Sequence, residues 1–167
     1  MIVIKAHELA IWRDLKSKIS IVIPSTVVNN EAFYFDTIRG ERRFPINLSG
    51  DIATGMIAEE AATPEELRNL LNIFDDNTIE MIHDGEKEAL ALIYGGRFGG
   101  ALFCTSDIPA IRALGLMGCP DNGISLEEIL KNIGLQKPLE PHYTQSFFNH
   151  HLSRGRRDRI TRTGLRN

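Results

Sequence analysis

The pattern of apolar and polar positions along the chain predicts strands and helices in alternation. Short runs rich in β-branched residues recur at residues 2–4, 19–23, 79–82 and 101–104, and a stretch with apolar residues at helical spacing follows each of them. Parallel strands need crossover connections, which helices commonly supply. The rhythm therefore predicts an α/β domain of three layers, with helices on both faces of a mostly parallel sheet.

Local sequence signals predict where two of these helices start and which segment interrupts the alternation of strands and helices. TPEE at residues 63–66 and SLEE at residues 125–128 are capping boxes, and each predicts a helix start. The segment 35–50 breaks the rhythm and reads as an inserted hairpin or loop, which carries three cations: Arg39, Arg42 and Arg43.

The 167 residues fit one domain with a sizeable core, and we assign it to residues 1–135. Residues 136–153 predict an amphipathic helix, whose apolar stripe docks either on the domain's own core or on a partner. Residues 154–167 form a basic tail with six Arg and one Asp, while residues 1–153 carry a net charge of −8. Such a tail either binds phosphate backbones or is a solvated, partly disordered terminus.

Composition excludes several classes of protein. With 43% hydrophobic and 25% charged residues, the chain is neither disordered throughout nor a disulfide scaffold. No apolar run approaches the roughly 18 to 20 residues of a membrane span or the core of a signal peptide, so we expect a cytoplasmic protein without membrane contact. Cys104 and Cys119 match neither a redox pair nor a zinc pattern and are expected to be buried thiols.

Three carboxylates follow consecutive predicted strands: Glu31, Glu86 and Asp107. In open α/β sheets the working crevice lies beyond the carboxyl ends of the strands, so these side chains are expected to converge. Clustered carboxylates repel one another unless a cation compensates, and hard oxygen ligands favour Mg²⁺ or Mn²⁺. Each also has a structural interpretation: Glu86 complementing a helix N-terminus, Asp107 an N-cap, and Glu31 a surface residue.

Three segments carry a resemblance to a known family. IVIPSTVVNNEA (residues 21–32), GEKEALAL (residues 85–92) and ALFCTSD (residues 101–107) resemble the second, third and fourth acidic motifs of the PIN domain family. The resemblance covers about residues 1–135 and implies a Mg²⁺- or Mn²⁺-dependent endoribonuclease, often the toxin of a toxin-antitoxin pair. It implies that Glu31, Glu86 and Asp107 are catalytic metal ligands and that Thr105 supports the Asp107 site.

The chain departs from the PIN pattern at its start, where a first Asp is expected at the end of the opening strand. In one alignment Lys5 occupies that position, and in the other, which we favour, the Asp precedes Met1 by about two residues. Either alignment removes a metal ligand from this polypeptide. We therefore expect weak or absent nuclease activity from a chain of nucleolytic lineage.

Two functions from different classes follow. In the first, a PIN-type ribonuclease hydrolyses RNA phosphodiester bonds, with RNA steered by basic residues that comprise Arg39, Arg42, Arg43, Arg154, Arg156 and Arg157. In the second, a non-catalytic PIN-like module binds RNA or a protein partner. A homodimer is expected in both cases, and an antitoxin protein is the partner that the resemblance implies.

Overall fold

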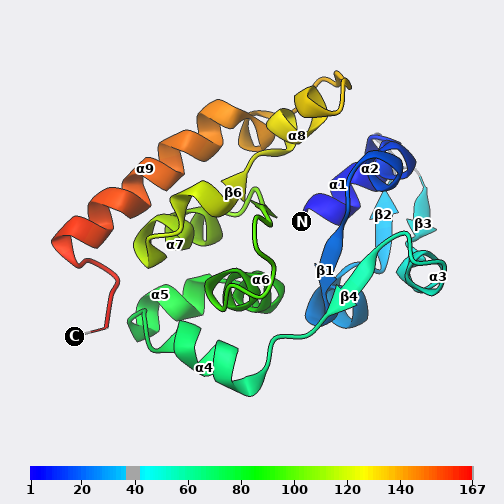
Figure 1. Cartoon of the computed structure of the whole chain (residues 1–167). Helices are drawn as coiled ribbons and strands as arrows, with labels where there is room; N and C mark the ends of the chain where they lie inside the picture. The colour runs from blue at the N-terminus through cyan, green and yellow to red at the C-terminus, as the bar shows by residue number, and fades with distance from the viewer. Residues whose placement is uncertain (37–41, 167) are drawn as a thin grey trace. The chain divides into compact units, whose positions relative to one another are not determined.

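The computed structural model describes residues 1–36 and 42–166, which form two compact units, Met1–Ala61 and Ala62–Asn167 (Figure 1). Both units combine helices with short strand pairs, so the fold class is mixed α/β. The sequence prediction placed residues 1–135 in one domain, whereas the structure divides that stretch after Ala61. No helix in the described part of the chain is both long enough and apolar enough to cross a bilayer.

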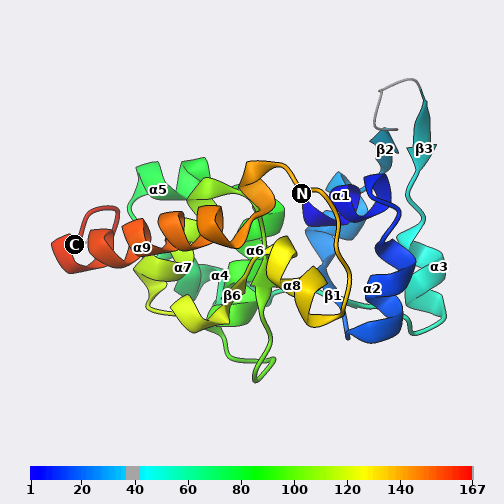
Figure 2. The same ribbon diagram turned by 90° about the horizontal axis from the view of Figure 1, so that it is seen from above.

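The described residues of the first unit, 1–36 and 42–61, form three helices, one π-helical turn and two strand pairs. In chain order these are α1 (Ile2–Glu8), α2 (Trp12–Lys18), β1 (Val22–Pro24), the π turn Val27–Glu31, β2 (Tyr34–Asp36), β3 (Arg43–Pro45), α3 (Leu48–Ala53) and β4 (Ala58–Glu60). Strands β1 and β4 pair in parallel (Figure 1), and β2 and β3 pair antiparallel (Figure 2). The antiparallel pair lies within the segment that was predicted as an inserted hairpin or loop.

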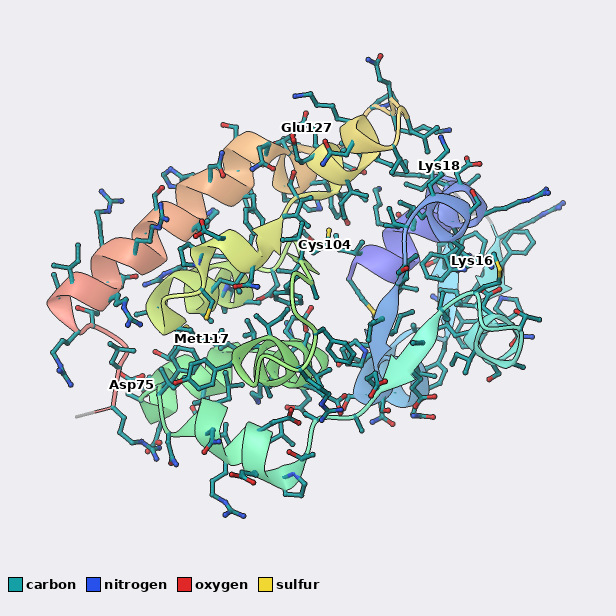
Figure 3. All side chains as sticks on the ribbon, in the orientation of Figure 1. Lys16, Lys18, Asp75, Cys104, Met117 and Glu127 are labelled. Atoms are coloured by element: carbon teal, nitrogen blue, oxygen red, sulfur yellow. The ribbon has the colours of Figure 1, made fainter. Side chains whose placement is uncertain are left out.

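A tryptophan anchors the core of the first unit. Trp12 is buried, and its indole N–H donates to Asp51 Oδ2 at 2.8 Å. Lys16, labelled in Figure 3, pairs with the other carboxylate oxygen of Asp51. Burial opposes ionisation of Asp51, but the hydrogen bonds from Lys16 and Trp12 outweigh it and lower the pKa of this carboxyl. The carboxylate therefore ties α3 to α2.

The second unit is mainly helical. Its elements are α4 (Pro64–Leu71), α5 (Asp76–Met81), α6 (Asp84–Tyr94), β5 (Phe103–Cys104), α7 (Ile108–Met117), a 3₁₀ turn (Pro120–Asn122), β6 (Gly123–Ile124), α8 (Leu126–Asn132), a second 3₁₀ turn (Pro141–Tyr143) and α9 (Gln145–Thr161). Strands β5 and β6 pair in parallel, with Phe103 opposite Gly123. In the described residues the strands thus form two-stranded pairs, and parallel pairing is present in both units.

Both predicted helix starts are confirmed. The Thr63 hydroxyl accepts from the Glu66 N–H at 3.2 Å, and the Glu66 carboxylate accepts from the Thr63 N–H at 2.7 Å, which completes a capping box. Ser125 accepts from the Glu128 N–H at 3.1 Å at the start of α8.

Two of the four predicted strands are wrong. Residues 2–4 belong to α1, because the run continues into Lys5, Ala6 and Glu8, which favour helix, and an apolar run this short does not distinguish strand from helix. Residues 79–82 overlap the end of α5, whose N-cap is Asp75. The Asp75 carboxylate accepts from the Thr78 N–H at 2.8 Å, a local cap that commits the segment to a helix.

Helix α7 is the centre of the second unit. Seven of its ten residues are buried, as expected for a helix that is apolar around most of its circumference. Helices α6 and α9 both pack on it, and α9 runs beside it in both views (Figures 1 and 2). The crossing of α7 and α9 is close because glycines meet there. A Cβ built on Gly155 would lie 2.1 Å from the Arg112 carbonyl oxygen.

The structure corrects the predicted boundary between an amphipathic helix and a basic tail. Helix α9 runs continuously from Gln145 to Thr161, so residues 154–161 are helical rather than a disordered terminus. Asp158 accepts from Arg112, and Arg159 donates to the Leu116 carbonyl at 2.6 Å. These non-local bonds hold the segment against α7, and a local charge pattern does not reveal them.

Candidate functional site

The first turns of α6 and α7 lie next to each other in the second unit. Asp107 is the N-cap of α7, and its Oδ1 accepts from the Ala110 N–H at 2.9 Å. The other oxygen, Oδ2, lies 3.5 Å from Nδ1 of His83, which is the N-cap residue of α6. Glu86 lies in the first turn of α6. One contact between caps therefore brings the two helix starts that carry Glu86 and Asp107 to the same place.

Asp107 is positioned by the strand before it and by its own turn. Strand β5 ends at Cys104, labelled in Figure 3, three residues before Asp107. The buried Thr105 hydroxyl accepts from the Asp107 backbone N–H at 3.1 Å. Thr105 thus fixes the backbone from which the Asp107 carboxylate projects. The role of Thr105 in supporting a metal site stays a prediction.

Both helix starts favour negative charge. The unpaired N–H groups and the dipole of a helix N-terminus stabilise nearby carboxylates. Glu86 and Asp107 are half-buried, while Asp84, in the same turn as Glu86, is exposed and pairs with Lys87 at 2.9 Å. The half-buried carboxylates are therefore the better candidates for binding a ligand, and Asp84 is a surface ion pair.

Glu88, two residues after Glu86, was not among the acidic residues predicted from the sequence. Glu88 is 7% exposed, and its carboxylate accepts from the Ala62 N–H at 3.1 Å. It connects α6 to the segment before α4, which is a structural role. Glu88 lies between Gly85 and Leu90, which are buried residues of α6. This position could have identified Glu88, in contrast to Glu86, as a buried side chain.

Glu31 belongs to the first unit, whereas Glu86 and Asp107 belong to the second. It is half-buried and is the last residue of the π-helical turn. In that turn Asn29 donates to the Glu59 carboxylate at 3.0 Å, which links the turn to β4. The convergence of all three acids stays a prediction.

The chemistry of Glu86 and Asp107 suits a hard divalent cation. Mg²⁺ is bound in many sites by one or two carboxylates, with water and substrate phosphate oxygens completing its shell. Within residues 1–36 and 42–166, no group of three or more His, Cys, Asp or Glu side chains is arranged to hold a metal ion. The pair therefore fits a site that depends on the substrate for ligands better than a closed structural site.

The predicted RNA-binding arginines fall into two groups. Arg39 lies outside the described residues. Arg42 and Arg43 are exposed in the first unit, and Arg43 pairs with Asp36 at 3.0 Å while its guanidinium lies 6.0 Å from the Tyr34 ring centre. The second group comprises three exposed residues of α9: Arg154, Arg156 and Arg157.

Comparison with known proteins adds no relative. No protein-family model, no curated protein and no solved structure matches this chain. Function is therefore inferred from the residues and their geometry alone.

Proposed function

We propose that this chain is a metal-dependent ribonuclease of PIN type, with a three-layer PIN-like arrangement and a Mg²⁺ or Mn²⁺ site at Glu86 and Asp107. The observation that carries the proposal is the 3.5 Å contact between His83 and Asp107, which joins the two helix starts. The role of Glu31 as a third metal ligand stays a prediction from the sequence, because Glu31 belongs to the first unit. The reaction is hydrolysis of RNA phosphodiester bonds.

The residues of the second unit have distinct roles in this proposal. A divalent cation, when bound, supplies a Lewis acid for phosphodiester hydrolysis. Asp107 is held in place by the Ala110 N–H and by Thr105, which leaves its Oδ2, 3.5 Å from His83 Nδ1, as the oxygen proposed to bind the cation. The two helix N-termini favour the anionic carboxylates and phosphate oxygens that the site must gather. The exposed arginines provide the attraction that brings RNA to an otherwise acidic protein.

A second candidate is a non-catalytic PIN-like module that binds RNA or a protein partner. The contacts of Asp107 favour it, because an N-cap needs only the Ala110 N–H, and a cap stabilises α7 without any metal. The His83 contact also occupies the oxygen that a cation would use.

Metal binding separates the two candidates. We would titrate Mn²⁺ into the wild-type chain and follow the loss of free Mn²⁺ signal by electron paramagnetic resonance. Asp107→Asn keeps the capping oxygen and removes the charge, and Glu86→Gln removes the other charge. Asp84→Asn is the matched control, because it removes a carboxylate from the same turn at an exposed position.

The ribonuclease proposal expects Mn²⁺ binding at micromolar to millimolar concentration that both site variants abolish and Asp84→Asn retains. It also expects weak Mn²⁺-dependent cleavage of single-stranded RNA, since the first Asp of the PIN pattern is missing from this chain, and Asp107→Asn should eliminate that cleavage. Unchanged Mn²⁺ binding in both site variants contradicts the proposed site, and metal binding without cleavage supports the non-catalytic module. The homodimer and the antitoxin partner stay predictions, and sedimentation velocity tests the first of them.

A further inference from the structure

The outward side of α9 carries positive charge that no acidic side chain among the described residues neutralises. Arg154, Arg156 and Arg157 are exposed, and among the described residues no acidic side chain pairs with them. The single acid of α9, Asp158, is engaged by Arg112 at 2.5 Å on the side that faces α7. We call Arg154, Arg156 and Arg157 the α9 basic face.

This face is built on a rigid support. Phe148, His151 and Gly155 are buried on the opposite side of the helix, and Thr144 caps its start by accepting from the Phe147 N–H. The chain after α9 is tied back to the unit, since the Asp75 N–H donates to the Gly164 carbonyl at 3.0 Å. Because the backbone is already ordered, a ligand of the basic face does not have to order a flexible tail.

We propose that the α9 basic face binds the phosphates of an RNA backbone. The guanidinium group presents several donors in a planar fork that matches phosphate oxygens, and it keeps its charge at all physiological pH values. Residues 1–153 carry a net charge of −8, so the basic face gives an otherwise acidic chain a local cluster of positive charge for a polyanion. The choice of RNA, rather than another polyanion, rests on the proposed function.

Two other partners fit the face less well. A helix that lies on a membrane needs a broad apolar face, but the apolar side of α9 packs on α7, and Ile160, 82% exposed, is the exception. A protein partner is usually anchored by aromatic or aliphatic side chains at the centre of the interface. The basic face offers three cations around one isoleucine, which suits a charged backbone.

The test measures binding to fluorescein-labelled single-stranded RNA by anisotropy, over a salt series and in EDTA so that cleavage cannot occur. We compare the wild type with R154Q/R156Q/R157Q. The control R68Q/K131Q/K137Q removes the same charge from other exposed positions of the second unit. Because a phosphate contact on a single strand contributes about 0.7 to the slope of log K against log salt, the basic-face triple variant should lower that slope by about 2.

The control variant should keep most of the wild-type slope, and single-stranded DNA of equal length should show the same dependence on the basic face. Equal loss in the two triple variants would overturn the proposal, because net charge alone would then explain binding. The proposal would also be overturned if the protein bound vesicles containing phosphatidylserine through the basic face and did not bind RNA. RNA binding is measured in EDTA, whereas the metal site is tested by Mn²⁺ titration without RNA, so failure of the metal site and failure of the basic face are separate results.

Discussion

The crossing of α7 and α9 makes a strong prediction about Gly155. A Cβ at this position would lie 2.1 Å from the Arg112 carbonyl oxygen and 2.9 Å from the carbonyl carbon. Ordinary van der Waals contact begins at 3.4 Å, so Gly155→Ala must push the two helices apart by more than 1 Å. Both obstructing atoms are backbone atoms of α7, which cannot rotate away as a side chain can.

The magnitude follows from two opposing effects. Overpacking a well-packed core costs about 1 to 3 kcal/mol, and a clash with backbone belongs at the upper end of that range. Alanine is a better helix former than glycine by about 1 kcal/mol, which offsets part of the cost. We therefore expect Gly155→Ala to lower the free energy of unfolding of the second unit by about 2 kcal/mol.

Urea unfolding followed by far-UV circular dichroism measures this loss. For a slope of about 2 kcal/mol per molar urea, the midpoint should fall by about 1 M. Ser153→Ala is the matched control, because it is an exposed position of the same helix and should change stability by less than about 0.5 kcal/mol. Fluorescence of Trp12, which lies in the first unit, should report a transition unaffected by either substitution. A midpoint for Gly155→Ala equal to or above that of the wild type would refute the close crossing.

Three further predictions concern single side chains. Hydrogen bonds from Arg97, and next from the Thr63 backbone N–H, hold the pKa of Glu66 below its ordinary value of 4.5. The stability that ionised Glu66 contributes is therefore present above pH 4.5 and is lost as the pH falls through the folded-state pKa. Glu66→Gln should therefore flatten the dependence of the unfolding midpoint on pH below about pH 5. Glu88→Leu should cost about 1 kcal/mol, because it leaves the partly buried Ala62 backbone N–H without its acceptor, whereas Glu88→Gln should retain most of the stability in the same urea assay. Ala10 has a φ of 54°, in the left-handed region, so Ala10→Gly should raise the thermal stability of the first unit by about 1 kcal/mol, and a lower melting temperature would contradict this.

Helix starts were predictable from the sequence because their signals are local. A cap needs a short polar side chain and an N–H two or three residues later, and both lie within one turn. The starts of α4 and α8 are accordingly where the sequence placed them. The structural interpretation of Asp107 as an N-cap is also confirmed, from the same kind of local signal.

Strand predictions failed where an apolar run had to be assigned without knowledge of its partner. Residues 2–4 and residues 19–23 are both runs rich in isoleucine and valine, yet only the second run includes strand residues, which pair with β4. Pairing partners lie far apart in the chain, so the residues of a run do not by themselves show whether it forms a strand. The contact between His83 and Asp107 was missed for the same reason, because it joins caps of two helices that are separated by β5.

The second half of α9 shows why an ordered helix can read as a disordered tail. Apolar periodicity detects helices that dock through aliphatic side chains, but this segment docks through a glycine, an ion pair from Asp158 and a hydrogen bond from Arg159. Such contacts leave a polar sequence with little amphipathic pattern. The same geometry turns the remaining arginines outward, since the glycine and Asp158 occupy the inner side. The order of this helix and the exposure of its positive charge therefore have one cause.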